Sequence, residues 1–375
     1  NINNETHYGM KITDNVITDI FNQLIKKSKY YKRKKEIQKF NDKHKVLKKG
    51  ISITPIKFGI SFTTTHLNQA GALVHIYTDG SVHLNHGGIE MGQGLMTKLA
   101  QITSHELGLS YEFIKITSTD TEKVPNTSAS AASATTDLNG GAIINAIYKL
   151  KSNLNNFIYD HYNVKSIIRY ENDYVHFDKR KITFKELISK AYLNRVSLSS
   201  SGFFKTSKID INTKTLKGRS FLYFTYGAAV SEVIVDTLTG ENKLLQVDII
   251  HDVGNSINKR IDKGQIEGGF IQGLGWLTTE EISWRKDGNI LTHSPSTYKI
   301  PTAGETPFKL NVEIYKSGFN KEEVVNRSKA VGEPPFMLAI SSFTAIKDAV
   351  FNANKKKGSA NLIAPATPEN ILKSI

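Results

Sequence analysis

Helix-like and strand-like segments follow one another irregularly along this chain, and this irregular order limits its possible folds more than any other feature. Apolar residues recur with the helical period in some segments and alternate with the strand period in others. No strict strand–helix–strand repeat connects the segments, so the chain is predicted to have an α+β fold. Helices are predicted at residues 11–45 (two of them), 95–107, 138–159, 184–192, 261–276 and 337–354, and strands at 51–65, 71–86, 113–118, 174–177, 228–235, 243–251 and 311–315. The residues between 192 and 216 are predicted to form a polar loop.

The 375 residues are enough for a sizeable core, in one large domain or two lobes. We expect a basic helical segment at residues 1–50 and a domain at residues 51–375, with mixed sheet-and-helix lobes at about 51–215 and 216–375. The sequence has no cysteine, which excludes disulfides and cysteine-ligated iron–sulfur clusters within it. No apolar run approaches the ~20 residues that span a bilayer, and no signal peptide is visible, so we expect no membrane partner.

A basic stretch accounts for much of the net charge of +14. Twelve Lys or Arg residues lie between Lys26 and Lys49, beside Tyr30 and Tyr31. A nucleic-acid-binding module could use such a patch for phosphate contacts and base stacking. An apolar stripe runs through the same region at Ile20, Leu24, Ile25 and Ile37. We therefore interpret the segment as the solvated face of a packed helix and expect no nucleic-acid partner.

The turn Gly332-Glu333-Pro334-Pro335 places one carboxylate on a stiff backbone between apolar residues. Glycine permits a close approach to whatever lies in front of it, and Pro334 should push Glu333 towards an extended conformation. A carboxylate whose pKa is tuned by burial or by a helix N-terminus suits general-base catalysis. A surface glutamate ahead of a helix that has proline in its first turn would look the same, so the motif alone leaves both interpretations open.

Three segments rich in small residues could each have a structural or a ligand-binding role. Residues 87–94 are glycine-rich and join a strand to a helix, where free backbone N–H groups could approach an anion. Residues 125–136 are uncharged and rich in Ser, Thr and Ala, which suits a flexible linker or a close wrap around a polar ligand. Residues 264–275 place glycines at close spacing on a helix, which favours tight helix packing.

Several long motifs occur in a fixed order along the chain: Lys57-Phe-Gly-Ile-Ser-Phe-Thr63, His86-Gly-Gly-Ile-Glu-Met-Gly-Gln-Gly-Leu95, Val124-Pro-Asn-Thr-Ser-Ala-Ser-Ala-Ala-Ser133, Gly264-Gln-Ile-Glu-Gly-Gly-Phe-Ile-Gln-Gly-Leu-Gly275 and Ser328-Lys-Ala-Val-Gly-Glu-Pro-Pro-Phe336. In this order they resemble the molybdenum-binding part of xanthine dehydrogenase, from about Thr6 to about Lys356. Residues 65–75 and 77–86 are most similar to the bacterial form, in which this part is a separate large subunit. The resemblance implies a second molybdenum-cofactor-binding domain of the xanthine dehydrogenase and aldehyde oxidase type.

The resemblance also assigns roles to individual residues. Glu333 is implied to be the catalytic base, Phe62 to pack against a flat heteroaromatic substrate, and Thr63 to touch that substrate. The implied ligands of the molybdenum–molybdopterin cofactor are Met91, Gln93, Ser130, Ala131, Ala132, Ser133, Thr135 and Gln265. The backbone of Ala132 is implied to approach the metal. Because the pterin dithiolene holds the molybdenum, no protein metal ligand is implied.

His83 and His86 are spaced like possible metal ligands. They have no carboxylate or third ligand nearby in the sequence. We therefore interpret them as strand and turn residues.

The implied reaction is oxidative hydroxylation of hypoxanthine and xanthine to urate. Its electrons would leave through [2Fe–2S] clusters, FAD and NAD on a partner chain in a cytoplasmic hetero-oligomer. The first half of the family's molybdenum-binding part, with several of its substrate contacts, is missing from this sequence. We expect the chain to be a fragment or a split-gene product that binds cofactor and substrate poorly by itself. An aldehyde oxidase or another N-heterocycle hydroxylase is the alternative.

Overall fold

The computed structural model describes residues 4–123, 126–131, 133–354 and 361–375. Its α-helices are α1 (Ile17–Lys27), α2 (Tyr30–Lys43), α3 (Leu95–Leu107), α4 (Thr135–Tyr162), α5 (Phe184–Leu193), α6 (Lys259–Thr278), α7 (Ile340–Ala353) and α8 (Pro368–Ser374), with 3-10 helices that include η5 (Pro334–Ala339). Its strands are β1 (Leu47–Ile60), β2 (Gln69–Ile76), β3 (Val82–His86), β4 (Ile114–Ile116), β5 (Arg169–Glu171), β6 (Tyr174–Phe177), β7 (Arg180–Thr183), β8 (Ser199–Lys205), β9 (Asp210–Asn212), β10 (Lys217–Arg219), β11 (Tyr223–Asp236), β12 (Asn242–His251) and β13 (Lys309–Ile314). Helices and strands are mixed as an α+β fold requires, which confirms the predicted class.

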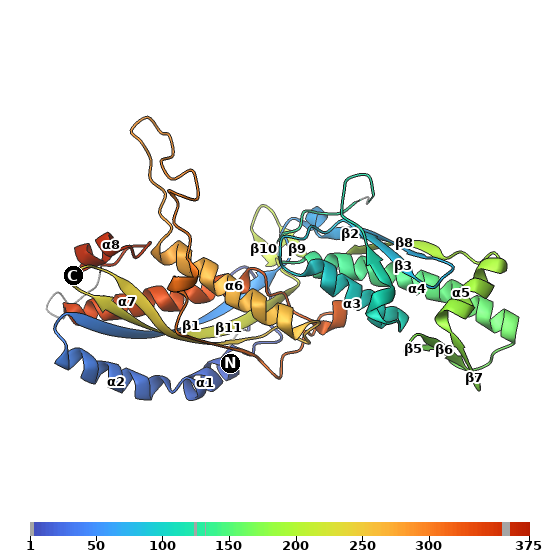
Figure 1. The fold of residues 1–375 in the computed structure, drawn as a ribbon, viewed down its shortest axis with the longest axis horizontal. Helices are drawn as coiled ribbons and strands as arrows, with labels where there is room; N and C mark the ends of the chain where they lie inside the picture. Colours follow the sequence, from blue (N-terminus) through green and yellow to red (C-terminus); the bar gives the residue numbers. More distant parts are fainter. Residues whose placement is uncertain (1–3, 124–125, 132, 355–360) are drawn as a thin grey trace.

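The molecule is elongated and consists of two lobes that meet in the middle (Figure 1). The long-sheet lobe contains a sheet of order β1-β11-β12-β13, in which β1 and β11 pair antiparallel along 14 residues each. The short-sheet lobe contains a sheet of order β4-β3-β2-β8. The chain begins in the long-sheet lobe, crosses to the short-sheet lobe after β1, and returns along β11.

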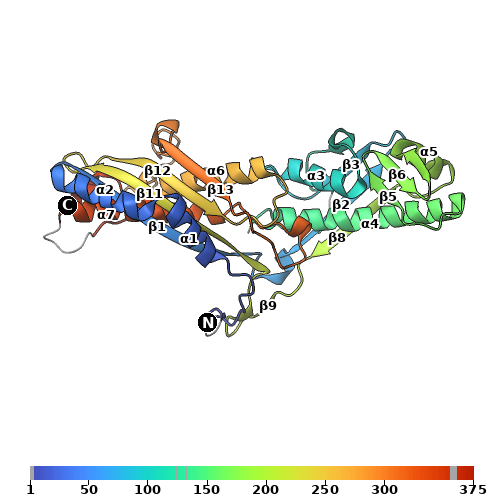
Figure 2. The ribbon, with the colours of Figure 1, turned by 90° about the horizontal axis from the view of Figure 1, so that it is seen from below.

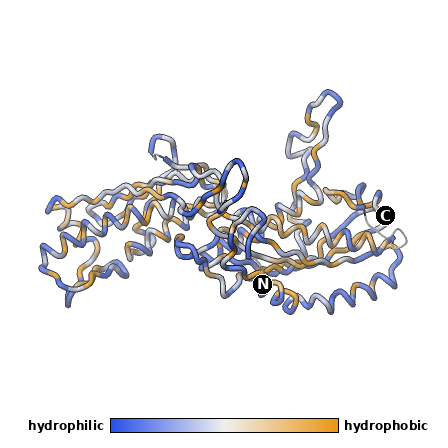
Figure 3. Tube along the Cα trace, turned by 180° about the vertical axis from the view of Figure 1, so that it is seen from behind, coloured by the Kyte–Doolittle hydropathy of each residue, from blue (hydrophilic) through white to orange (hydrophobic). Residues whose placement is uncertain are grey.

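The long sheet is covered on both faces. Ala229 and Ile249 point to the face where α6 and α7 pack, whereas Ala228 and Ile250 point to the face covered by α1 and α2. This alternation follows from the two-residue period of a strand. The view from below shows α1 and α2 lying along the sheet (Figure 2). The predicted apolar stripe is confirmed at Ile20, Leu24 and Ile37, which are buried, and the trace of α2 is mostly hydrophilic (Figure 3).

The short sheet packs against α3 and α4, and its core is one large apolar cluster. The 28-residue helix α4 runs along this lobe, with the small sheet β5-β6-β7 and α5 at its far end (Figure 1). At the junction with the long-sheet lobe, Tyr223 and Leu222 at the start of β11 belong to the same cluster. The long sheet therefore reaches into the core of the second lobe.

The prediction of a polar loop after residue 192 was wrong, because Ser199–Lys205 forms β8 and pairs antiparallel with β2. Gly202 explains the difference, because a Cβ there would lie 1.9 Å from the carbonyl oxygen of Ala142 on α4. Because residue 202 is a glycine, the strand can pack directly against the helix, and the segment forms a strand although its serines are polar.

The predicted boundary between lobes at residues 215 and 216 falls in the turn between the paired strands β9 and β10, and it stays a prediction. A long excursion, residues 279–308, leaves the long-sheet lobe between α6 and β13 (Figure 1). None of the helices in the described parts of the chain is both long enough and apolar enough to cross a membrane.

Candidate active site

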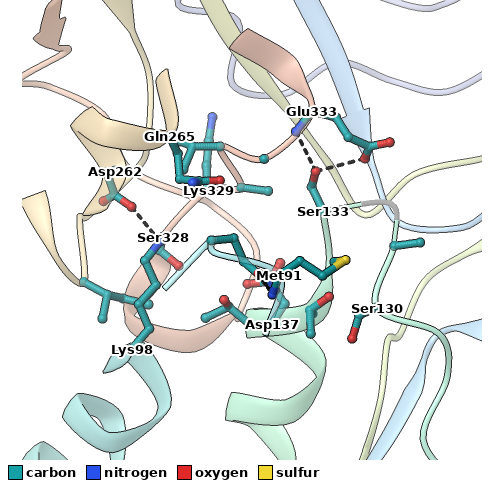
Figure 4. Close-up of a pocket in the computed structure, with 18 residues that line it drawn as sticks. Met91, Lys98, Ser130, Ser133, Asp137, Asp262, Gln265, Ser328, Lys329 and Glu333 are labelled. Carbon is teal, nitrogen blue, oxygen red and sulfur yellow. Dashed lines mark hydrogen bonds and ion pairs between the residues drawn. The ribbon is translucent and has the colours of Figure 1, made fainter. Parts of the chain in front are cut away.

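A cavity of about 310 Å³ lies where the two lobes meet (Figure 4). The short-sheet lobe contributes the loop before α3, residue Lys98 on α3, and residues 130, 131, 133 and 135–137 around the start of α4. The long-sheet lobe contributes the first turns of α6 and the loop of residues 328–333. The volume falls within the range of small-molecule sites.

Most of the site residues implied by the resemblance line this cavity: Met91, Gln93, Ser130, Ala131, Ser133, Thr135, Gln265 and Glu333. Segments up to about 240 positions apart in sequence are thus brought together, although the roles of the individual residues stay predictions. Ala132 lies outside the described residues.

Phe62 and Thr63 are not among the described residues that line the cavity. They follow β1 in a turn held by Asn68, whose Oδ1 accepts a hydrogen bond from the Phe62 N–H at 2.9 Å and whose Nδ2 donates to the Phe62 carbonyl at 2.9 Å. Phe62 is half-buried and Thr63 is exposed. Their contact with substrate stays a prediction.

Glu333 is held at the cavity by one serine. The backbone N–H of Glu333 donates to Ser133 Oγ at 2.8 Å, and the same hydroxyl donates to Glu333 Oε2 at 2.9 Å (Figure 4). The side chain is otherwise exposed, and no described residue contributes a hydrogen bond to Oε1. One carboxylate oxygen is therefore oriented while the other is free to accept a proton.

The backbone at Glu333 differs from the extended conformation predicted for a residue before proline. Its φ of −87° and ψ of −37° are helical, because Glu333 is the residue that precedes η5. The Phe336 N–H donates to the Glu333 carbonyl at 3.1 Å, and this first-turn hydrogen bond offsets the steric preference imposed by Pro334. The prediction of a close approach at Gly332 is confirmed, since a Cβ there would lie 2.8 Å from Ser133 Oγ.

The glycine-rich loop before α3 differs from the anion site suggested by its sequence. The N–H groups of Gly92 and Gly94 both donate to Glu90 Oε1 at 2.9 Å, and Met96 N–H donates to Glu90 Oε2 at 3.0 Å. The chain's own carboxylate thus satisfies the helix N-terminus. Met91 projects beyond this cap and is 68% exposed on the rim of the cavity.

The start of α4 is better suited to an anionic ligand than the loop before α3. Ala134, which precedes the helix, provides no side-chain cap for the first turn. Thr135 and Thr136 of this turn line the cavity, beside the hydroxyls of Ser130 and Ser133. Uncapped N–H groups, the helix dipole and small hydroxyl side chains together suit a phosphate-bearing cofactor such as molybdopterin. Among the described residues, no group of three or more His, Asp or Glu is arranged to bind a metal ion directly.

Charged residues in the wall of the cavity form buried ion pairs, one of which joins the two lobes, and sequence reasoning missed them. Lys98 on α3 pairs with Asp262 on α6 at 2.6 Å, and both side chains are largely buried. Lys329 Nζ, 1% exposed, lies 2.7 Å from Asp14 Oδ2 and 2.8 Å from Asp252 Oδ2. Of these charged residues, only Lys329 lies within one of the sequence motifs, four residues before Glu333.

Asp137, in the first turn of α4, is a buried carboxylic acid at the cavity wall. Burial raises its pKa to about 7, although the hydrogen bond from Tyr223 and the charge of Lys98 act to lower it. The Tyr223 hydroxyl donates to Asp137 Oδ2 at 2.7 Å and accepts from the Ala330 N–H at 3.1 Å. The Tyr223 hydroxyl thus links the loop that carries Glu333 to the start of α4.

The fold places the protein in a class of solved structures. It matches quinoline 2-oxidoreductase from Pseudomonas putida 86 with a TM-score of 0.85 at 21% identity, over 99% of this chain and 47% of that one. It matches a Cu,Mo-CO dehydrogenase with a TM-score of 0.82 at 20% identity, over 98% of this chain and 46% of that one. At this identity the likeness establishes the two-lobed fold and nothing finer.

The sequence then defines the family. Residues 23–307 match the model of the molybdopterin cofactor-binding domain, and the chain belongs to this family. It is 44% identical to the xanthine dehydrogenase/oxidase of Felis catus, over 98% of this chain, and 41% identical to xanthine dehydrogenase 2 of Arabidopsis thaliana, over 98%. The chain spans 26% of each of these relatives, about a quarter of their length. Because both relatives are eukaryotic, the bacterial arrangement with a separate large subunit stays a prediction.

Proposed function

We propose that this chain forms one side of the molybdenum-cofactor cleft of a xanthine dehydrogenase that oxidises hypoxanthine and xanthine to urate. The observation that carries the proposal is the position of Glu333, held by Ser133 at a cavity lined by most of the residues that the sequence resemblance implies to bind the cofactor. The 41–44% identity to xanthine dehydrogenases supports a purine as the substrate class. The rest of the molybdenum-binding subunit and a partner that carries FAD and [2Fe–2S] clusters would complete a cytoplasmic, NAD-reducing hetero-oligomer.

The residues that would hold the cofactor are those that line the cavity. Met91 and Gln93 would contact the pterin from the loop before α3, and Gln265 would contact it from α6. Ser130, Ala131, Ser133 and Thr135, with the uncapped start of α4, would hold the pterin and its phosphate arm. When bound, the cofactor supplies the two-electron oxidation.

Glu333 would act as the general base. Purine hydroxylation replaces a C–H bond by a C–O bond, takes its oxygen from water, and releases two protons and two electrons. The free Oε1 of Glu333 would accept the proton of the attacking oxygen, while Ser133 fixes the orientation of the carboxylate through Oε2. Phe62 and Thr63 would complete the substrate site through contacts with the flat ring.

Urate formation by the complete, assembled enzyme tests the proposal. We expect Glu333→Gln and Glu333→Ala to lower kcat by about 10²- to 10⁴-fold while the bound molybdenum is retained, because only the proton acceptor is lost. Glu281→Gln, the same change at an exposed glutamate outside the cavity, is the matched control and should keep full activity.

Two results would contradict the proposal. Full activity of the Glu333 variants would exclude Glu333 as the base. Failure of the intact, molybdenum-loaded assembly to form urate would exclude the purine assignment, and oxidation of aldehydes by the same preparation would identify the alternative substrate class.

A further inference from the structure

We propose that Tyr223 is a positioning residue for Glu333, whose hydroxyl fastens the loop of residues 328–333 to the start of α4. The inference rests on the proposed role of Glu333 and adds to it a residue outside the motifs of the family resemblance. Tyr223 is 3% exposed and is the first residue of β11, at the junction of the two lobes.

The tyrosine hydroxyl is a hydrogen-bond donor and a hydrogen-bond acceptor at the same time. It donates a hydrogen bond to Asp137 Oδ2 at 2.7 Å and accepts a hydrogen bond from the Ala330 N–H at 3.1 Å. Asp137 belongs to the short-sheet lobe, and Ala330 belongs to a loop of the long-sheet lobe. Phenylalanine would fill nearly the same space but has no hydroxyl, so it can make neither of these hydrogen bonds.

Glu333 depends on such an anchor because its direct support is slight. Both of its contacts with Ser133 pass through a single hydroxyl, and the side chain is exposed. Ser133 lies four residues before Asp137, and Ala330 lies three residues before Glu333. The Tyr223 bridge therefore connects the same two segments as the Ser133 contact, but through two side chains, Tyr223 and Asp137, that are buried.

The buried setting makes the bridge costly to break. Asp137 is 7% exposed, and the Ala330 N–H has the Tyr223 hydroxyl as its acceptor in the described structure. Removing the hydroxyl would leave the half-buried Ala330 N–H and the buried Asp137 carboxyl without their partner. The loop would relieve this by moving, and Glu333 would move with it.

Tyr223→Phe in the complete enzyme tests the inference, and the same strand provides a matched control. Tyr226 is 1% exposed, and its hydroxyl has no hydrogen-bond partner among the described residues. Tyr226→Phe therefore removes the same atom from the same strand without breaking a bond. For each variant we would measure kcat and KM for xanthine, bound molybdenum, and hydrogen exchange of the peptide that contains residues 328–333.

We expect Tyr223→Phe to lower kcat about tenfold, because a small displacement of a reacting group is costly. KM should stay within about twofold and molybdenum content should be unchanged, since the contacts that bind cofactor and substrate remain. Hydrogen exchange in residues 328–333 should be about tenfold faster. Tyr226→Phe should match the wild-type enzyme in all four measurements. Asp137→Leu, which breaks the bridge from its other end, should reproduce the faster exchange.

The inference is overturned if Tyr223→Phe and Asp137→Leu both leave exchange of residues 328–333 unchanged, or if Tyr223→Phe loses no more activity than Tyr226→Phe. Loss of molybdenum from Tyr223→Phe would also overturn it, because the tyrosine would then support the cofactor site in general. If the intact enzyme forms no urate, the proposed function fails while the exchange measurement still decides whether the bridge holds the loop.

Discussion

One buried residue at the site, Asp137, makes the stability of the fold depend on pH, and the sequence motifs do not reveal this dependence. Burial raises the pKa of Asp137 to about 7, against the hydrogen bond from Tyr223 and the charge of Lys98. In the unfolded chain the pKa is about 3.9, so the folded state binds the proton more tightly. Between about pH 4 and 7 the stability of the fold therefore decreases as pH rises, because ionisation of Asp137 costs more in the folded state.

Asp137→Asn should remove this cost and keep an oxygen that accepts the Tyr223 hydrogen bond. We expect the Tm of the variant relative to wild type to rise steadily from pH 4 to 7, in thermal unfolding at several pH values. Asp287→Asn is the control. Hydrogen bonds from Asn289 lower the pKa of exposed Asp287 below its usual value, so this carboxylate stays ionised from pH 4 to 7 and the Tm difference of Asp287→Asn should not change over that range. A Tm difference for Asp137→Asn that stays constant with pH would contradict this account.

Among the elements, the packing of η5 on α6 decides where the Glu333 turn lies. Gly273 on α6 makes the contact possible, since a Cβ there would lie 2.2 Å from the carbonyl oxygen of Phe336. At Gly268, on the same helix, an added Cβ would meet no atom within 4 Å in the described structure, apart from its chain neighbours and its own helix backbone. We expect Gly273→Ala to destabilise the fold by about 1–3 kcal/mol through overpacking. Gly268→Ala should stabilise it by about 0.5–1 kcal/mol through helix propensity.

Denaturant unfolding of the two glycine variants measures both effects. Because η5 begins directly after Glu333, Gly273→Ala should also reduce activity, whereas Gly268→Ala should not. Equal stability of the two variants would show that α6 and η5 are not in the close contact described.

Elements with a clear period were predictable from the sequence, and elements that depend on a distant neighbour were not. The helix predicted at residues 95–107 has these same bounds in the structure, because glycines flank an apolar helical repeat. The strand β8 was missed because Gly202 gains its partner only when α4 lies against it. Similarly, the motifs located the cavity wall, but the bridge between Tyr223 and Asp137 joins residues 86 positions apart. No local pattern signals such a pair.

Over the whole molecule, Lys329 connects three remote parts of the chain. It lies just before the Glu333 turn and pairs with Asp14 near the start of the chain and with Asp252 directly after β12. Gly254 N–H also donates to Asp252 Oδ1 at 2.9 Å, which helps to satisfy that carboxylate. The N-terminal segment is thereby fixed to the loop that carries Glu333.

Lys329→Met should therefore destabilise the whole fold, because it leaves two buried carboxylates without their cation. We expect a loss of about 3–5 kcal/mol in the free energy of unfolding, the usual cost of removing one partner of a buried ion pair. Lys27→Met is the matched control: the Lys27–Glu313 pair is 2.5 Å long, but its side chains are 48% and 37% exposed. Its removal should cost less than about 1 kcal/mol, since solvent screens such pairs. If denaturant unfolding gave similar losses for the two variants, Lys329 would not be the buried link between the N-terminal segment and the Glu333 loop.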